Sequence, residues 1–155
     1  MAADPKTVMP ALRVMTEDDV AAVMRIEKLA YPFPWTAGNF VDSIRAGYGA
    51  WVAAFGADVL GYAVLLPALD EAHLLNITIA PQRQGEGYGS WLLERVIEQA
   101  DHAGARCMIL EVRPSNIRAR TLYERRGFQQ VGVRKGYYPN GVLRREDAIV
   151  MRLGW

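Results

Sequence analysis

The sequence contains very little cysteine and histidine. Its 155 residues include one cysteine, Cys107, and two histidines, His73 and His102. A single cysteine can form neither an internal disulfide nor a cysteine-based zinc site, and the two histidines lack the spacing of metal ligands. We therefore expect no metal, and a reducing, cytoplasmic location. Repeats, linkers and low-complexity segments are also absent, so residues 1–155 are expected to form a single domain.

Long uninterrupted apolar segments are missing as well. The longest apolar stretch, residues 46–69, contains Asp58 and several glycines, whereas a membrane-spanning helix needs about 20 apolar residues without such breaks. Two buried strands joined by a tight turn explain this stretch better. The first ten residues carry Asp4 and Lys6 and have no apolar core, so we expect neither a signal peptide nor a membrane partner.

Charge is balanced overall but unevenly distributed. The formal net charge is +1, and the hydrophobic fraction of 51% with 23% charged residues is typical of a soluble globular protein. Residues 1–112 carry a net charge of −6, and residues 113–155 carry +7. A basic C-terminal third suits a phosphorylated ligand or nucleic acid, or it is an ordinary solvated helix face. Basic and aromatic residues do not alternate as in an RNA-binding platform, so we expect no direct contact with nucleic acid.

Hydrophobic periodicity predicts elements in the order β-α-α-β-β-β-α-β-α-β-β. The strand at 73–79, the helix at 88–103 and the strand at 107–112 form a crossover unit, which implies a parallel strand pair in a mixed sheet. The fold class is therefore α/β, an α+β sandwich. The other elements are expected as strands at 12–15, 51–55, 59–66, 129–134 and 148–153, as helices from Thr16, at 36–45 and from Ser115 or Asn116 to Arg126, and as a loop at 136–141.

A glycine-rich loop, Gln84-Gly85-Glu86-Gly87-Tyr88-Gly89-Ser90, lies between the strand at 73–79 and the helix that follows. Glycines let a backbone approach a ligand closely, and the first N–H groups of a helix lack internal partners, so the loop can bind a pyrophosphate or another anion. It is not a Walker motif, because no Gly-Lys-Ser/Thr follows, and it lacks the third glycine of the dinucleotide fingerprint. A plain tight turn before a capped helix stays open.

Several motifs in the same chain resemble the GNAT acetyltransferase superfamily. The pattern Gln84-x-x-Gly87-x-Gly89 is similar to the acetyl-CoA loop of that superfamily, and the segment from Ser115-Asn116 through Leu122-Tyr123-Glu124 to Gly127-Phe128 is similar to a later motif. Narrower features resemble the RimI type, the ribosomal-protein-alanine N-acetyltransferases: Phe33-Pro34-Trp35, Leu110-Glu111-Val112-Arg113, Tyr137-Tyr138-Pro139 and Glu146-Asp147-Ala148. The resemblance extends from Leu12 to Leu153, so the domain core is expected at about residues 12–153.

This resemblance implies a central mixed sheet with helices on both faces, and transfer of an acetyl group from acetyl-CoA to the N-terminal alanine of a protein, expected to be a small-subunit ribosomal protein. It also implies that the strands at 75–79 and 109–112 splay apart around the pantetheine arm. The residues implied for the arm are Ile77, Thr78 and Ile79; those for the pyrophosphate are Gly85, Glu86, Gly87, Tyr88, Gly89 and Ser90; and Asn116 contacts the coenzyme near the second helix start.

The loop departs from the RimI-type pattern Gln-Arg-Arg-Gly-x-Gly. Gly85 and Glu86 stand where that pattern has two arginines, so two cations are lost and one carboxylate is gained beside the expected phosphates. Backbone N–H donation is unaffected by this change. Arg83, or the pair Arg118 and Arg120, are the candidates to replace the missing side-chain contacts.

Acetyl transfer to an amine requires that the ammonium form first lose a proton, which a carboxylate in a partly desolvated cleft can accept. Glu111 lies in the apolar run 108–112, where burial is expected to raise its pKa. We hypothesise that Glu111 is the general base; alternatively it is a structural carboxylate paired with Arg113 on the same strand face. The departing thiolate benefits from a proton donor, and the resemblance implies Tyr123 in this role; otherwise Tyr123 is a core aromatic.

The resemblance places Trp35, Tyr137 and Tyr138 in loops that frame the acceptor peptide. Exposed loop aromatics suit a peptide groove, but they can equally fasten loops to the core. Two other functions stay open: acetylation of a lysine or a small-molecule amine, which would differ only in the acceptor loops, and a CoA-binding module without turnover. The presence of both Glu111 and Tyr123 argues against the second.

Overall fold

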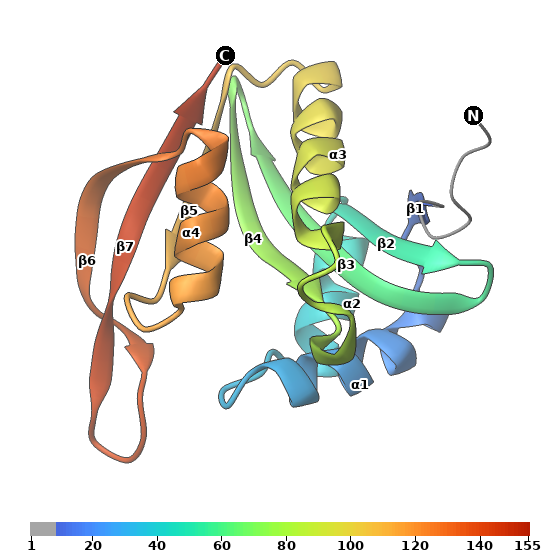
Figure 1. The fold of residues 1–155 in the computed structure, drawn as a ribbon, viewed down its shortest axis with the longest axis horizontal. Coiled ribbons are helices and arrows are strands. Elements are labelled where there is room, and N and C mark those ends of the chain that lie inside the picture. Colours follow the sequence, from blue (N-terminus) through green and yellow to red (C-terminus); the bar gives the residue numbers. More distant parts are fainter. Residues whose placement is uncertain (1–8) are drawn as a thin grey trace.

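The computed structural model describes residues 9–155 and contains a seven-stranded sheet in the order β1-β2-β3-β4-β5-β7-β6 (Figure 1). The strands are β1 (Ala11–Val14), β2 (Gly49–Phe55), β3 (Asp58–Ala68), β4 (Glu71–Ile79), β5 (Cys107–Val112), β6 (Gln129–Pro139) and β7 (Arg145–Gly154). The helices are α1 (Val20–Ala30), α2 (Ala37–Arg45), α3 (Tyr88–His102) and α4 (Ile117–Arg126), with 3-10 turns at Glu17–Asp19 and Pro81–Arg83. The predicted α/β class and element order are confirmed.

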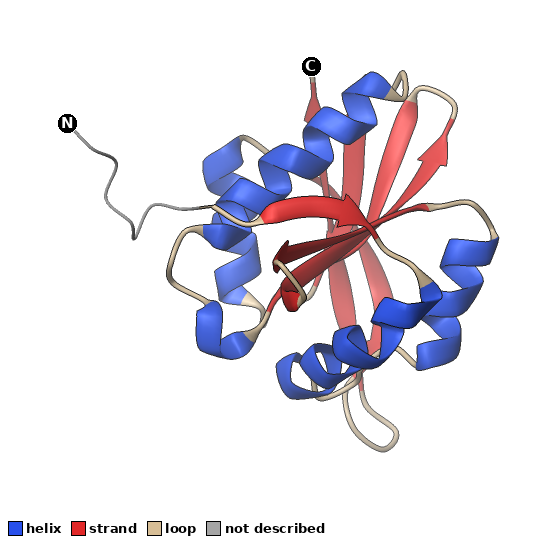
Figure 2. Ribbon diagram, turned by 90° about the vertical axis from the view of Figure 1, so that its right-hand side faces the viewer, coloured by secondary structure: helices blue, strands red, loops and turns tan. Residues whose placement is uncertain are grey.

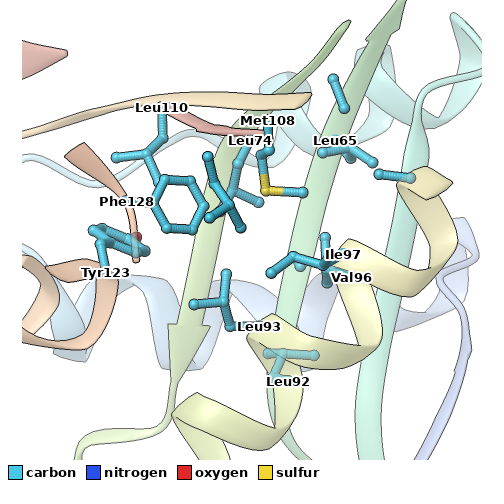
Figure 3. Close-up of a cluster of buried hydrophobic side chains, with 14 of the residues drawn as sticks. Leu65, Leu74, Leu92, Leu93, Val96, Ile97, Met108, Leu110, Tyr123 and Phe128 are labelled. Carbon is cyan, nitrogen blue, oxygen red and sulfur yellow. The ribbon is translucent and has the colours of Figure 1, made fainter. Parts of the chain in front are cut away.

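Helices cover both faces of this sheet, as Figure 2 shows. On one face α3 and α4 pack on β4, β5 and β7 through a large apolar cluster that includes Leu92, Val96, Met108 and Leu110 (Figure 3). On the other face α1 and α2 pack on β2 and β3 through a second cluster. Two cores, one on each side, therefore hold the sheet between them.

The central strands β4 and β5 are parallel, whereas the other neighbouring pairs are antiparallel. Their pairing runs only from Glu71–Cys107 to Leu74–Leu110, so β4 from Leu75 onward has no strand partner on this side among residues 9–155. Figure 1 shows the two strands close together near the C-terminus and apart at the opposite end. Backbone N–H and C=O groups along this edge of β4 are left for a ligand or water to satisfy.

A β-bulge in β4 changes which side chains face α1. The register against β3 shifts after Val64–Asn76, so that Leu65 pairs with Leu74. Side chains alternate along a strand, and one extra residue exchanges the two faces. Leu74 therefore joins the core under α3, while Asn76 turns toward α1 and hydrogen-bonds there.

Two expectations about the helical and C-terminal segments are wrong. The spacing of Val20, Val23, Met24 and Leu29 predicts that all four lie on one apolar face of the first helix, but Leu29 is 71% exposed, and Ile26 and Glu27 are buried instead. Tyr137 and Tyr138 do not lie in a loop, because β6 continues to Pro139 across an irregular register. That extension is possible because the Gly136 N–H bonds the Asp147 carboxylate at 2.8 Å and because an edge strand tolerates proline.

No helix within residues 9–155 combines the length and apolar character needed to cross a membrane.

Candidate active site

A cavity of about 770 Å³ lies where β4 and β5 separate. One wall comes from the end of β4, at Ile77, Thr78 and Ile79, and from the glycine-rich loop that follows it. The opposite wall comes from α4, including Tyr123, and from the segment that precedes it. The turn after α1, with Tyr31 and its neighbours, completes the lining. Sequence segments distant from one another thus meet around a single cavity.

The glycine-rich loop has the backbone of an anion-binding loop. Gly85 and Gly87 adopt left-handed φ angles of 82° and 88°, which side chains other than glycine seldom tolerate. Gly87 is also the N-cap of α3 and provides no side-chain cap. The N–H groups in the first turn of α3 are therefore available to an anion, with the positive end of the helix dipole behind them.

Of the cations near this loop, some bond other groups of the protein and others line the cavity. Arg83 is already engaged: it bonds Glu86 at 3.1 Å and Tyr88 at 3.3 Å, and its guanidinium lies over the Phe55 ring. Glu86 and Tyr88 therefore face Arg83 and do not line the cavity, unlike Gly85, Gly87, Gly89 and Ser90. On α4 the cavity-lining cations are Arg118 and Arg125, whereas Arg120 bonds the Pro114 carbonyl.

Asn116 and Tyr123 lie at the start and in the second turn of α4. The Asn116 side chain accepts the Ala119 N–H at 3.2 Å, which decides between Ser115 and Asn116 as the helix cap. Tyr123 is 6% exposed, packs against Phe128 with ring centroids 5.6 Å apart, and lines the cavity. Burial raises the pKa of Tyr123, so its phenol keeps its proton at neutral pH. Tyr123 is thus both a core aromatic and a protonated group at the cavity wall.

Glu111 follows the last β4–β5 pair and lies on the face opposite α3, since its neighbours Leu110 and Val112 belong to the α3 core. Its side chain is 6% exposed, and its Oε2 bonds His73 Nε2. The other oxygen, Oε1, lies 3.3 Å from Arg134 Nε without the alignment of a hydrogen bond.

These partners correct three expectations. Burial does raise the pKa of Glu111, but the hydrogen bond and charge of His73, with the charge of Arg134, more than offset it and leave the pKa below its usual value. Glu111 is not paired with Arg113, which instead contacts Glu146 and the Pro139 carbonyl. The sequence also predicts His73 as a surface or strand-end residue, but it lies inside β4 and its side chain is 27% exposed.

A second buried carboxylate, Glu27 on α1, organises the turn over the cavity. It is 1% exposed and accepts hydrogen bonds from Trp35 N–H at 2.9 Å, Tyr62 hydroxyl at 2.6 Å and Asn76 side-chain amide at 3.1 Å. The Thr78 hydroxyl donates to Asn76 at 2.8 Å and lies 2.7 Å from the Tyr31 hydroxyl. This chain of bonds connects α1, the bulged part of β4 and the cavity.

The predicted acceptor aromatics lie in two places. Tyr137 and Tyr138 stack edge to face on β6, and Arg113 lies between the rings of Tyr138, at 4.4 Å, and Phe33, at 5.4 Å. Arg113 and Phe33 line the cavity. Trp35 does not: it packs on Phe40 with ring centroids 5.0 Å apart and borders a separate hollow beside α2.

Sequence comparison identifies the family. The family described as Acetyltransferase (GNAT) matches residues 20–128. The chain belongs to the GNAT acetyltransferase family. Its members use acetyl-CoA as the acetyl donor, so the chain is an acetyl-CoA-dependent acyltransferase. Within residues 9–155, no three histidine, cysteine, aspartate or glutamate side chains lie together as a metal site.

Individual relatives of this GNAT acetyltransferase carry a more specific name. It is 35% identical over 145 residues, covering 94% of this chain and 97% of the other, to the [ribosomal protein bS18]-alanine N-acetyltransferase of Escherichia coli K12. It is 39% identical over 133 residues, covering 86% and 90%, to the protein of that name from Haemophilus influenzae. The crystal structure of the ribosomal-protein-S18-alanine N-acetyltransferase from Escherichia coli matches with a TM-score of 0.86, covering 94% of each chain.

The cavity of this GNAT acetyltransferase fits its donor. The uncapped start of α3 suits a pyrophosphate, and the unpaired edge of β4 suits the amides of a pantetheine arm.

Sequence reasoning missed His73, Glu27, Phe33 and the double stacking of Arg113. Phe33 stands in the motif Phe33-Pro34-Trp35, where only Trp35 was given a role. Glu27 also left a signal, since an acidic residue at the helical spacing of Val20 and Val23 falls on the buried face of α1. The contact of His73 with Glu111 depends on the parallel register of β4 and β5, which the sequence does not display.

Proposed function

We propose that this GNAT acetyltransferase transfers the acetyl group of acetyl-CoA to the N-terminal alanine of ribosomal protein bS18. The observation that carries this proposal is a protonated tyrosine, Tyr123, in the wall of the cavity where β4 and β5 separate. The carboxylate of Glu111 does not itself line the cavity, but it lies on β5 two residues before Arg113, which does. The names of relatives that match 86–94% of the chain support the acceptor. One domain, with a core of about residues 12–153, carries the whole reaction, and a ribosomal acceptor and a single cysteine favour the cytoplasm.

In this proposal the donor lies along the cavity. Backbone groups of Ile77, Thr78 and Ile79 hold the pantetheine arm, because β5 no longer pairs with this part of β4. Backbone N–H groups across Gly85–Ser90 hold the pyrophosphate, while the Glu86 and Tyr88 side chains stay with Arg83. Asn116 contacts the donor from the start of α4, where it lines the cavity.

Side-chain contacts to the phosphates then come from α4 instead of the loop. Arg118 and Arg125 line the cavity, and each can offer a guanidinium to a phosphate oxygen. Glu86 does not cancel this positive charge, because Arg83 already neutralises it. The two cations lost from the loop are thus replaced by two cations on the neighbouring helix.

The chemistry divides between two residues. Acetyl-CoA supplies an acetyl group on a thioester, which is open to attack by a neutral amine. Glu111 accepts the proton that the acceptor ammonium must lose, directly or through water, and its lowered pKa keeps it ionised at neutral pH. Tyr123 donates its phenolic proton to the thiolate that leaves, and the second proton that the nitrogen loses as the amide forms returns to Tyr123, directly or through water. Glu111 then releases the first proton to solvent, so one proton leaves overall.

The acceptor peptide enters from the face that carries Glu111. Phe33, Arg113 and Tyr138 form a stacked layer at this edge of the cavity, with Tyr137 next to it. We assign Tyr137 and Tyr138 to contact with the peptide. Trp35 contributes indirectly, because its N–H fixes the turn to Glu27 and its ring packs on Phe40.

The experiment that tests the proposal uses carbon-13 acetyl-CoA and two peptides with the N-terminal sequence of bS18. One peptide has a free N-terminal alanine and an internal lysine, and the matched control carries a formyl group on the alanine. Tandem mass spectrometry should locate the label on the alanine nitrogen of the first peptide and no label on the second. Label on the lysine of either peptide, or CoA-dependent binding without any labelled product, would contradict the proposal.

A further inference from the structure

The two oxygens of the Glu111 carboxylate have different surroundings. Oε2 is occupied by the ring of His73, whereas Oε1 has no hydrogen-bond partner among residues 9–155 although it is buried. Buried carboxylate oxygens are normally satisfied, and an unsatisfied one calls for a donor that the folded chain does not itself provide. The acceptor ammonium assigned to this site under the proposed function is such a donor.

The pairing of β4 with β5 places His73 next to Glu111. It lies in the part of β4 that pairs with β5, with Ile109 as its partner in the register, two residues before Glu111. Its side chain is 27% exposed, compared with 6% for Glu111, so the pair reaches from solvent to the buried oxygen.

We propose that His73 is a positioning residue for Glu111: it holds Oε2, so that Oε1 faces the acceptor amine. This inference rests on the proposed function and deepens it. None of the motifs quoted above includes position 73, and the role follows from the contact between the two strands.

The other groups around Glu111 do not duplicate this role. Arg134 on β6 is within ion-pair distance, but its side chain is 55% exposed, so solvent screens its charge. Tyr138, also on β6, has a pKa that burial and the nearby Glu111 raise, and it therefore stays neutral at neutral pH. The register partner of Glu111 on β7 is Val150, which does not titrate. Among these groups, only His73 forms a hydrogen bond with the Glu111 carboxylate.

The test compares the pH dependence of kcat for the unaltered enzyme, His73→Gln and His73→Leu. Glutamine keeps a donor near Oε2 but cannot become cationic, and leucine removes both properties. Without His73, burial acts against fewer compensating partners, so the pKa of Glu111 rises and the carboxylate becomes protonated at higher pH. Acetylation of an alanine-terminated peptide, followed by mass spectrometry between about pH 5 and pH 8.5, should then decline earlier on the acid side.

The deciding quantity is the kcat of the unaltered enzyme divided by the kcat of His73→Gln, measured at each pH. This ratio should be smallest at the alkaline end of the range. Below the raised pKa of Glu111 in the variant, it should increase by up to about tenfold for each unit by which the pH falls. The ionisation of the peptide itself cancels in this ratio. The matched control is His102→Gln, since His102 ends α3 and is exposed, and its ratio should stay flat.

A flat ratio for His73→Gln would overturn the inference, even if the variant unfolds at a lower temperature. His73→Leu should show the same acid-side decline with lower activity throughout. Circular dichroism shows whether each variant is folded. If one of the two does not fold, the other supplies the measurement. Full activity of Glu111→Gln would instead defeat the catalytic assignment of the proposed function, so the two failures are separable.

Discussion

Two buried glutamates lie on the same side of the central sheet, and they are held in opposite ways. Glu27 is surrounded by neutral donors: a backbone N–H, a tyrosine hydroxyl and an amide. Glu111 is surrounded by a histidine and an arginine, and one of its oxygens makes no hydrogen bond. Neutral donors satisfy a carboxylate in a fixed geometry, whereas titratable partners adjust its charge. The comparison contrasts a carboxylate whose donors all belong to the fold with the one to which we assign the proton transfer.

The variant with the largest expected effect is Glu111→Gln, which tests whether Glu111 differs from Glu27 by acting in catalysis. The amide keeps the shape of the side chain but cannot accept the acceptor's proton, so kcat should fall by at least about 100-fold. Acetylation of an alanine-terminated peptide gives kcat, and thermal unfolding should change little. Activity equal to that of the unaltered enzyme across the pH range would show that Glu111 is another structural carboxylate.

Tyr123→Phe asks whether the buried tyrosine does more than pack. Phenylalanine keeps the contact with Phe128 and removes only the hydroxyl, so kcat should fall by about 10- to 100-fold while acetyl-CoA affinity is kept. Isothermal titration with acetyl-CoA and steady-state kinetics separate the two quantities. Weaker binding with unchanged turnover would assign Tyr123 to packing alone.

Glu27→Gln tests the other side of the comparison. Three donors converge on this carboxylate, and an amide cannot accept from all of them, so the free energy of unfolding should fall by about 1–3 kcal/mol. Denaturant titration measures the loss. Because Glu27 acts through the turn at Trp35, kcat measured well below the unfolding temperature should be largely preserved. A large loss of kcat without a loss of stability would remove the distinction between the two glutamates.

The smallest expected effect concerns the phosphate end of the cavity. Replacing Arg118 or Arg125 by alanine removes one exposed cation near the pyrophosphate, so the KM for acetyl-CoA should rise by about two- to fivefold, and less at high salt. The matched control is Arg126→Ala on the same helix, since Arg126 pairs with Glu94 on α3. Equal effects for all three arginines would point to general charge instead of a phosphate contact.

The sequence predicted the fold well because its signals are local. Thr36 and Asn116 cap their helices as expected, and β5 has the predicted bounds of 107–112. The apolar alternation of 148–153 correctly marked β7. Features that depend on an irregular register between two paired strands were not predicted. The length of β6 depends on a bond between Gly136 and Asp147, and the face on which Asn76 lies depends on a bulge.

The site was predictable in its residues more than in its electrostatics. The family motifs pointed to Glu111, Tyr123 and the glycine-rich loop, and the structure brings Tyr123 and most of the loop to one cavity. The direction of the pKa shift of Glu111 was wrong, because His73 lies 38 positions away in the sequence and meets it only across the sheet. The roles of Glu111 and Tyr123 stay predictions until their variants are measured.

The outermost strand, β6, carries Arg134 beside the carboxylate and, a few residues later, the two tyrosines assigned to the acceptor. These features are joined by one short stretch of an edge strand, which among the strands of residues 9–155 pairs with β7 alone. Any change that moves this hairpin to admit a different protein terminus also moves a positive charge next to Glu111. Under the proposed function, a change of acceptor at this hairpin would therefore also change how readily Glu111 removes the acceptor's proton.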